Sequence, residues 1–133
     1  GANVTTLTYK STTKSQLIDI TEDIKEAVIT SGIQSGVVNV FVKHATASIF
    51  IAENADLNLK RDILTTLSRC VPVNDQYHHT GGNAEAHIKS SIMGTSVMVP
   101  VQDATMLLGK WQGIFLGDFD GPRERTVVVT LLH

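Results

Sequence analysis

The sequence predicts an α+β domain built mainly on antiparallel β-sheet, sandwich-like, with two or three covering helices. Three observations support this prediction. The chain has 133 residues, 42% hydrophobic and 18% charged, which is typical of one globular domain with its own core. Amphipathic helical patterns fall in the first two thirds, and short β-branched runs separated by Gly and Asp dominate the last third. No repeat or linker divides the chain, so we expect one domain spanning residues 1–133.

The N-terminal segment begins with a strand and continues into a helix. Residues 3–10 alternate apolar and polar side chains, as in a half-buried strand. Asp19 followed three residues later by Glu22 resembles a capping box. The apolar positions after it keep helical spacing as far as Gly32, which is the residue type that commonly ends a helix.

A pair of strands and a second helix follow. Residues 36–43 and 48–52 are rich in β-branched and aromatic side chains, which favours strands, and His44 comes at the end of the first. Asp56 is suited to cap a helix with an apolar stripe of leucines and isoleucine. Pro72 stops that helix from continuing.

The last part of the chain passes from an irregular segment to a short helix and then to strands. Residues 73–82 are polar and carry no periodic pattern, and Asn83 is suited to cap a helix that runs to about Met93. Three further runs predict strands, at residues 95–101, 105–119 and 125–133. A sheet of this size in a short chain leaves an apolar face or edge that a homo-oligomeric contact would cover.

Charge and cysteine content narrow the classes of partner. Eleven basic and thirteen acidic side chains leave a formal charge of -2, so no global field attracts nucleic acid or an anionic membrane. Any anionic ligand is therefore bound locally. The single Cys70 excludes an intrachain disulfide and is compatible with the cytoplasm. No apolar run is long enough to span a bilayer, and residues 1–10 lack the apolar core of a signal peptide.

Three histidines in polar segments are the main candidates for chemistry. His44 follows a predicted strand, His79 lies in the irregular segment, and His87 falls near the start of the third predicted helix. Three imidazoles can form an open metal site, or can serve as acids, bases and phosphate ligands. The alternative is that they are ordinary hydrogen-bonded or exposed side chains, as we expect for His78.

A second candidate is an anion pocket at the start of the third helix. Gly82 and Asn83 precede that helix, so backbone N–H groups would face an approaching anion, and Lys89 would add a positive charge. Phosphate is the natural occupant. The spacing is neither that of a P-loop nor that of a dinucleotide fingerprint, and a plain loop before a capped helix remains the alternative.

Carboxylates and arginines supply two further candidate groups. Glu53 follows a predicted strand and could act as a general base, orient a histidine or bind metal, whereas the nearby Asp56 has the simpler duty of helix cap. Arg123 lies on a Gly-Pro turn and suits phosphate recognition, although a charged turn is the commoner explanation.

Long motifs around these residues resemble the YjbQ-like family, also called secondary thiamine-phosphate synthase enzymes. The motifs are HATASIFIAENAD from His44, YHHTGGNAEAHIKSSIMGTS from Tyr77 and LLGKWQGIFLGDFDGPRER from Leu107. The resemblance covers nearly the whole chain. It implies a compact α+β domain that assembles as a homotrimer, with a polar pocket formed by the histidine-bearing segments. The family pattern includes His44, His79 and His87 but not His78.

The resemblance also implies a reaction and its requirements. The family's reaction type joins the diphosphate ester of a hydroxymethyl-aminopyrimidine to a thiazole phosphate, with loss of diphosphate. That chemistry needs an anion pocket, a divalent cation such as zinc or magnesium, and a proton donor for the leaving oxygen. Gly82, Asn83 and Lys89, with Arg61 or Arg123, are the candidates for the pocket. The only tryptophan, Trp111, could stack a heterocycle, but core or subunit interface is the simpler role.

We therefore expect an enzyme acting on a phosphorylated small molecule. The catalytic residues would be His44, His79, His87 and Glu53, and the three histidines would also be the metal ligands. Two alternatives stay open: a homotrimeric module that binds metal or phosphate without catalysis, and a structural trimer without chemistry.

Overall fold

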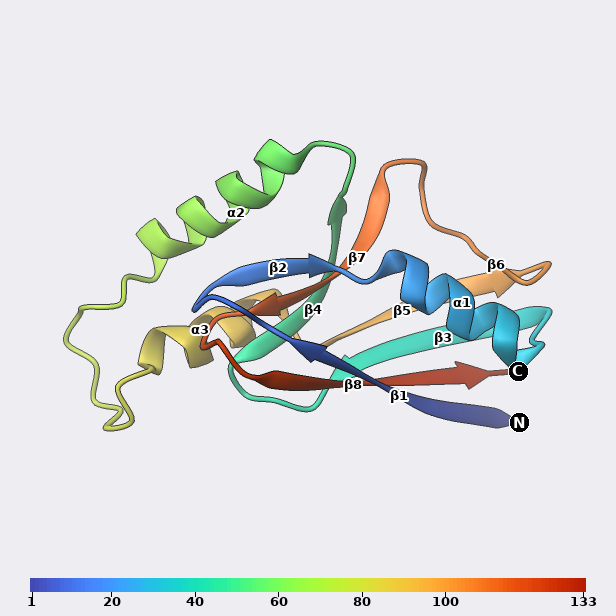
Figure 1. The fold of residues 1–133 in the computed structure, drawn as a ribbon, viewed down its shortest axis with the longest axis horizontal. Helices are drawn as coiled ribbons and strands as arrows, with labels where there is room; N and C mark the ends of the chain where they lie inside the picture. The colour runs from blue at the N-terminus through green and yellow to red at the C-terminus, as the bar shows by residue number, and fades with distance from the viewer.

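Two antiparallel sheets and three helices make up the computed structural model, which describes residues 1–133 (Figure 1). The strands are β1 (Ala2–Lys10), β2 (Gln16–Asp19), β3 (Ser35–Val42), β4 (Ala47–Glu53), β5 (Ser96–Gln102), β6 (Thr105–Met106), β7 (Gln112–Asp118) and β8 (Glu124–Leu132). The helices are α1 (Thr21–Ser31), α2 (Leu57–Cys70) and α3 (Ala84–Met93). The predicted α+β class with mainly antiparallel sheet is confirmed.

The main core lies between the two sheets and α1. The larger sheet has the strand order β1-β8-β3-β5-β6, the smaller has the order β2-β7-β4, and every strand pair is antiparallel. A cluster of 17 buried apolar residues joins them, including Val127 of the larger sheet, Ile114 of the smaller sheet and Ile24 of α1. Every second residue of the central strands points into this cluster, as the pleat of a sheet requires.

The first helix starts differently from the predicted capping box. The carboxylate of Asp19 does accept hydrogen bonds from the backbone N–H and the hydroxyl of Thr21, at 3.0 and 2.5 Å. Glu22, however, does not reach back to the cap; it lies 3.3 Å from Lys25 on the exposed face. Gly32 ends the helix with a φ of 76°, the left-handed conformation that glycine adopts without strain.

The start of α2 agrees with the sequence prediction. Asp56 caps α2 by accepting a hydrogen bond from the backbone N–H of Asn58 at 2.9 Å. Its half-buried apolar stripe packs on a second, smaller core around Phe50 and Phe115 of the three-stranded sheet. No helix in the structure is both long and apolar enough to cross a bilayer.

Two strand predictions need correction. The four-residue strand β2 carries too short a pattern to be seen in the sequence, and it forms because it pairs with β7, with Leu17 opposite Gly117. The predicted strand over residues 105–119 is two strands, β6 and β7, separated by a turn in which Gln112 N–H donates to Gly109 O. Asp103 and Ala104 connect β5 to β6 with φ of 53° and 59°, both in the left-handed region.

The face of the larger sheet that points away from the core is not covered by a helix. Ile24 and Val28 place α1 on the core side, with Val40 of β3. On the opposite face, Phe41 is 39% exposed and Met98 is 59% exposed. This apolar sheet face is therefore open in a single subunit.

A buried ion pair joins the two sheets at one end. Arg125 of β8 belongs to the larger sheet and Asp118 of β7 to the smaller, and their side chains meet through two hydrogen bonds of 2.7 and 2.9 Å. Both side chains are almost completely buried. Burial alone would raise the pKa of Asp118, but the hydrogen bonds from Arg125 and Ser11 outweigh it and hold that pKa below its usual value.

We predict that Asp118→Asn lowers the free energy of unfolding by about 3–5 kcal/mol, because it leaves the guanidinium of Arg125 buried without a counter-charge. Chemical denaturation at neutral pH measures the change. Asp62→Asn removes the same charge from the exposed face of α2 and should change stability by less than about 0.5 kcal/mol. Equal effects of the two substitutions would contradict the prediction.

Candidate functional site

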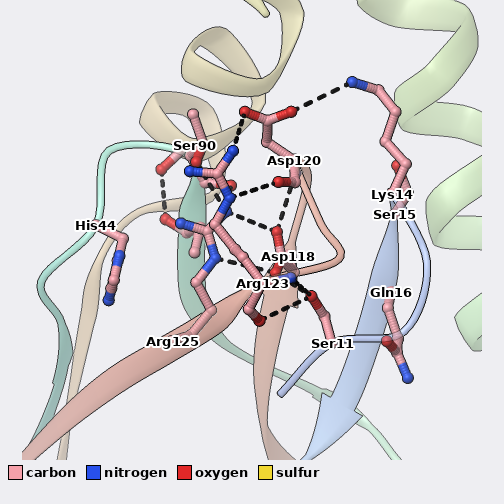
Figure 2. A network of polar contacts seen from close by, with 12 residues as sticks. Ser11, Lys14, Ser15, Gln16, His44, Ser90, Asp118, Asp120, Arg123 and Arg125 are labelled. Atoms are coloured by element: carbon pink, nitrogen blue, oxygen red, sulfur yellow. Dashed lines mark hydrogen bonds and ion pairs between the residues drawn. The ribbon is translucent and has the colours of Figure 1, made fainter. Parts of the chain in front are cut away.

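The N-terminus of α3 lies where segments distant in the sequence meet. The hydroxyl of Ser90 in α3 donates to the carbonyl of Ala47 at the start of β4. Asn83, just before α3, donates to Asp120 in the turn between β7 and β8 at 2.8 Å. Lys14, in the loop before β2, lies 2.9 Å from Glu85 in the first turn of α3. Polar side chains of three segments and a backbone carbonyl of a fourth thus meet in one network, of which Figure 2 shows Lys14, Ser90 and Asp120.

Asp120 is the centre of the exposed part of this network. Besides Asn83, its carboxylate binds Arg123 Nη2 at 3.0 Å and lies 3.6 Å from Lys14 Nζ. Lys14 and Arg123 are about half exposed, at 45% and 52%, so both cations also face solvent. Figure 2 shows Lys14 reaching the network from the side opposite to His44. The structure thereby gathers two cations and an amide around the start of α3.

Asn83 does not act as the side-chain cap that the sequence predicts. It occupies the N-cap position of α3 but makes no cap hydrogen bond. Its Nδ2 donates to Asp120, and its Oδ1 lies 3.1 Å from His79 Nε2. The side-chain acceptor that normally satisfies the first-turn N–H groups is therefore turned away from the helix.

Two ionisable residues of α3 are buried beneath this network. Glu85 is 1% exposed and Lys89 is 4% exposed. The nearby Lys14 holds the pKa of Glu85 below its usual value, although burial alone would raise it. The Oε1 atom of Glu85 lies 2.9 Å from Lys14 Nζ, so the buried carboxylate has one partly exposed cation as its partner.

Lys89 has no ionic partner of its own. Its Nζ lies 6.0 Å from the centre of the Phe119 ring and makes no hydrogen bond or ion pair. Burial lowers its pKa. The nearest carboxylate, that of Glu85, acts on Lys89 only from beyond ion-pair distance. A lysine that is almost fully buried without a direct carboxylate contact is rare in proteins, and such groups cluster at functional sites. Its burial also means that Lys14, not Lys89, is the lysine that an anion at the helix start would meet first.

His79 and His87 are in contact. Their ring centres lie 4.9 Å apart and the ring planes meet at 69°. Because Asn83 Oδ1 can only accept, the 3.1 Å contact makes Nε2 of His79 the protonated nitrogen. Gly81 permits this arrangement, since a Cβ there would lie 2.7 Å from Nε2 of His79.

Shallow hollows of about 290 and 310 Å³ open beside these two rings. The first is lined by Gly82, His79 and Glu85 among others, and the second by His79 and His87. Tyr77 contributes to both. Figure 1 places this end of α3 next to the irregular segment that links it to α2. A small ligand at the start of α3 would therefore touch both imidazoles.

His44 does not join the other two histidines in one subunit. Its Nε2 accepts a hydrogen bond from the backbone N–H of Thr126 at 2.9 Å. Burial and the neighbouring Arg125 cation lower its pKa, so the ring is neutral with the proton on Nδ1. No group of three His, Cys, Asp or Glu side chains in the chain could hold a metal ion. The expectation that three imidazoles converge is therefore wrong for a single subunit.

Glu53 lies at the other end of the smaller sheet. It is the last residue of β4, whereas Ala47, which contacts α3, is the first. Seven residues of strand extend over about 20 Å, so Glu53 is remote from His79 and His87 within one subunit. Its Oε2 instead accepts a hydrogen bond from Asp56 N–H at 3.3 Å, in the turn that leads to α2.

The sequence reasoning missed some residues of this end of the molecule. Lys14 and Glu85 did not stand out, because they lie in a loop and a helix without any local motif, whereas Asp120 belongs to the charged Gly-Pro turn that also carries Arg123. Arg123 did stand out, and it does belong to the network. Only the three-dimensional arrangement brings the four side chains together.

The comparisons with known proteins agree with this fold. A family model described as UPF0047 protein YjbQ-like matches residues 5–133. The chain belongs to the YjbQ-like UPF0047 family. A UPF0047 protein of Methanocaldococcus jannaschii is 43% identical over 92% of this chain and 89% of its own length. The UPF0047 protein YugU of Bacillus subtilis is 39% identical over 96% of this chain and 97% of its own length.

Solved YjbQ-like structures have the same architecture. An uncharacterised conserved protein of the family from Clostridium acetobutylicum superposes with a TM-score of 0.94 at 43% identity, covering 96% of this chain and 99% of its own. A protein of unknown function from Sulfolobus solfataricus gives 0.95 at 30% identity, covering 98% and 96%. Membership in the UPF0047 family thus establishes the fold of this chain and leaves the activity to be inferred from its residues.

We predict that the stabilisation that His44 provides is lost in acid. An unfolded histidine has a pKa of about 6.5 and native His44 a lower one, so the native state binds fewer protons between the two values. The hydrogen bond from Thr126 is fully present above pH ~6.5 and is lost as the pH falls through the native pKa.

Chemical denaturation of the wild type and His44→Ala at pH ~7.5 and ~5 tests this prediction. At the higher pH, the free energy of unfolding of the wild type should exceed that of His44→Ala by about 1 kcal/mol or more, and this gap between the two proteins should narrow at the lower pH. His78→Ala, an exposed histidine, should show no such gap. A gap that stays constant with pH would show that His44 does not titrate as described.

Proposed function

We propose that the start of α3 binds the phosphate of a small phosphorylated molecule and that His79 and His87 act on it as acid and base. The observation that carries this proposal is the N-cap Asn83, whose side chain makes no cap hydrogen bond and contacts His79 instead. The positive end of the helix dipole favours an anion at that position. The two imidazoles stand beside it.

The surrounding charges support the same proposal. Lys14 and Arg123 are partly exposed and carry the charge needed to hold a phosphate or a diphosphate. Glu85 and Lys89 are buried behind them without full hydrogen bonding, which is a costly arrangement that functional sites tolerate. The residues of the proposed pocket are therefore Gly82, Asn83, His79 and His87, with Lys89 behind it.

The reaction class that suits this pocket is the departure of a phosphate or diphosphate group. An imidazole can donate a proton to the leaving oxygen while the cations and N–H groups stabilise its negative charge. The thiamine-phosphate synthase reaction that the family resemblance suggests is the specific version of this proposal.

A divalent metal is the second part of the proposal. Two imidazoles bound to one tetrahedral zinc, each at about 2.0–2.1 Å, place their ring centres about 5 Å apart, close to the 4.9 Å between His79 and His87. Zinc fits nitrogen ligands better than magnesium does. One subunit supplies only these two ligands at this place, so phosphate, water or a neighbouring subunit would complete the coordination. If His44 or Glu53 takes part, it does so from another subunit.

Titration calorimetry with inorganic diphosphate tests the pocket. We expect saturable binding by the wild type and about tenfold weaker binding by His79→Ala and His87→Ala. His133→Ala, which removes an exposed histidine that lines neither hollow, is the control and should bind as the wild type does. Loss of binding in the control alone, or unchanged binding in both variants, would contradict the proposal. Zinc content of untagged protein, measured for the same variants, tests the metal.

We also propose that the open face of the larger sheet is buried in a homotrimer. Phe41, Met98 and Leu132 are exposed on it at 39%, 59% and 39%. They lie on neighbouring strands, because Phe41 pairs with Val128 of β8 and Asn39 of the same strand pairs with Met98 of β5. Large apolar side chains exposed on an uncovered sheet face, here interspersed with polar residues such as Asn39, are typical of a subunit interface. A cytoplasmic location is a separate proposal, with which the free thiol of Cys70 is compatible.

Light scattering after size exclusion tests the assembly. We expect a mass about three times 14.4 kDa for the wild type, and a smaller species for Met98→Lys, because a lysine ammonium on this face loses its hydration on assembly. Leu57→Lys changes another exposed apolar residue, which is 77% exposed at the start of α2, and should leave the mass unchanged. A monomeric wild type, or dissociation by Leu57→Lys alone, would contradict the proposal.

A further inference from the structure

A third hollow lies at the end of the smaller sheet that is remote from α3. It has a volume of about 280 Å³ and opens between the start of α1, the end of β4 and the turn before β7. Its polar lining includes Asn54 and Gln112, and its apolar lining includes Met106 and Leu108. None of its lining residues belongs to the pocket proposed at α3.

Asn54 is held in one orientation from three sides. Its Nδ2 donates to Asp19 Oδ2 at 3.1 Å, and its backbone N–H donates to the carbonyl of Trp111 at 3.0 Å. Its side chain lies directly on Gly113, where any Cβ would overlap it. Asp19 is itself fixed by Thr21, and these hydrogen bonds keep its pKa low although burial alone would raise it. Oδ1 of Asn54 is left as an acceptor without a protein partner.

Gln112 is held through the oxygen of its side-chain amide, whereas Asn54 is held through the nitrogen. The Oε1 atom of Gln112 accepts a hydrogen bond from the backbone N–H of Gly109 at 2.7 Å. The Nε2 group of Gln112 is left as a donor without a protein partner. Asn54 and Gln112 both line the hollow, and they keep one acceptor and one donor, respectively, that no protein group uses.

Two lysines, one glutamate and an apolar floor also line the hollow. Lys25 is 53% exposed and forms an exposed ion pair with Glu22 at 3.3 Å. Lys110 has no carboxylate partner, and its Nζ lies 4.9 Å from the centre of the exposed Trp111 ring. Met106 is 7% exposed and forms part of the floor. An apolar surface with a few oriented polar groups and a charged rim is the usual composition of a small-molecule site.

We propose that this hollow is a second ligand site, for a planar heterocycle that carries a phosphate group. A lactam edge, with adjacent N–H and C=O groups, is the complement of the acceptor on Asn54 and the donor on Gln112. The ring lies on Met106 and Leu108, and the phosphate binds Lys25 and Lys110. The site does not depend on the pocket proposed at α3.

Three probes separate the contributions of the ring and the phosphate. Uridine 5′-monophosphate carries both groups, uridine lacks the phosphate, and inorganic phosphate lacks the ring. In an NMR titration of the wild-type protein, the nucleotide should shift the side-chain amide signals of Asn54 and Gln112 and the indole N–H signal of Trp111. Uridine and phosphate should each bind at least about tenfold more weakly than the nucleotide.

Gln112→Glu is the sharpest variant, because a carboxylate still accepts from Gly109 N–H but offers no donor to the ligand. We expect at least about tenfold weaker nucleotide binding, and a similar loss in Lys25→Ala combined with Lys110→Ala. His87→Ala, at the α3 pocket, tests whether the nucleotide binds there instead, and it should leave the nucleotide-induced shifts of the Asn54 and Gln112 amide signals as they are in the wild type.

Two results would overturn the proposal. One is nucleotide binding that is absent below about 5 mM in the wild type or unchanged in Gln112→Glu. The other is binding lost in His87→Ala and kept in Gln112→Glu, which would place the nucleotide at α3 and support the first proposal instead. Failure of diphosphate to bind at α3 would leave the expected nucleotide results unchanged, so the two proposals fail separately.

Discussion

The ion pair between Arg125 and Asp118 is the contact on which the polar end of this molecule depends. It joins β8 of the larger sheet to β7 of the smaller one in a place from which water is excluded. Ser11 donates to the same carboxylate at 2.6 Å, and Arg125 also donates to the hydroxyl of Thr46 at 2.8 Å. Four segments are therefore tied to one buried charge pair, and the turn after Asp118 has little freedom.

That restraint reaches the start of α3 through the next residues of the chain. Asp118 Oδ1 accepts the backbone N–H of Asp120, and Asp120 in turn binds Asn83, which is why the N-cap side chain turns away from its helix. A structural ion pair thus helps to set the geometry of the start of α3, where we propose that an anion binds. Partners of this kind orient the residues that touch a ligand.

Local features of the structure were predictable from the sequence, and features that depend on distant contacts were not. The start of α2 follows from Asp56 and the apolar stripe after it, all within one stretch of chain. The orientation of Asn83 depends on Asp120, 37 residues away, and the role of His44 depends on Thr126, 82 residues away. Motif spacing could identify these side chains as candidates, but it could not show that His44 already has a backbone partner. Glu53 was misplaced for the same reason, since nothing local tells which end of β4 meets α3.

The hairpin between β5 and β6 has a consequence for motion. Ala104 is in the left-handed region, where a residue with a Cβ is strained, and β6 pairs with β5 through only two residues. The hairpin is kept closed by the packing of Met106 into the core and by two further backbone hydrogen bonds, from Ala104 N–H to Gln34 O at 3.0 Å and from Leu107 N–H to Pro100 O at 2.9 Å. A transient opening of this short strand would remove the floor of the third hollow. The amide hydrogens near Ala104 would then exchange with solvent sooner than those of the central strands. A molecule bound in the hollow would slow that exchange. Hydrogen exchange at the turn of Asp103 and Ala104 would therefore show whether the hollow is occupied.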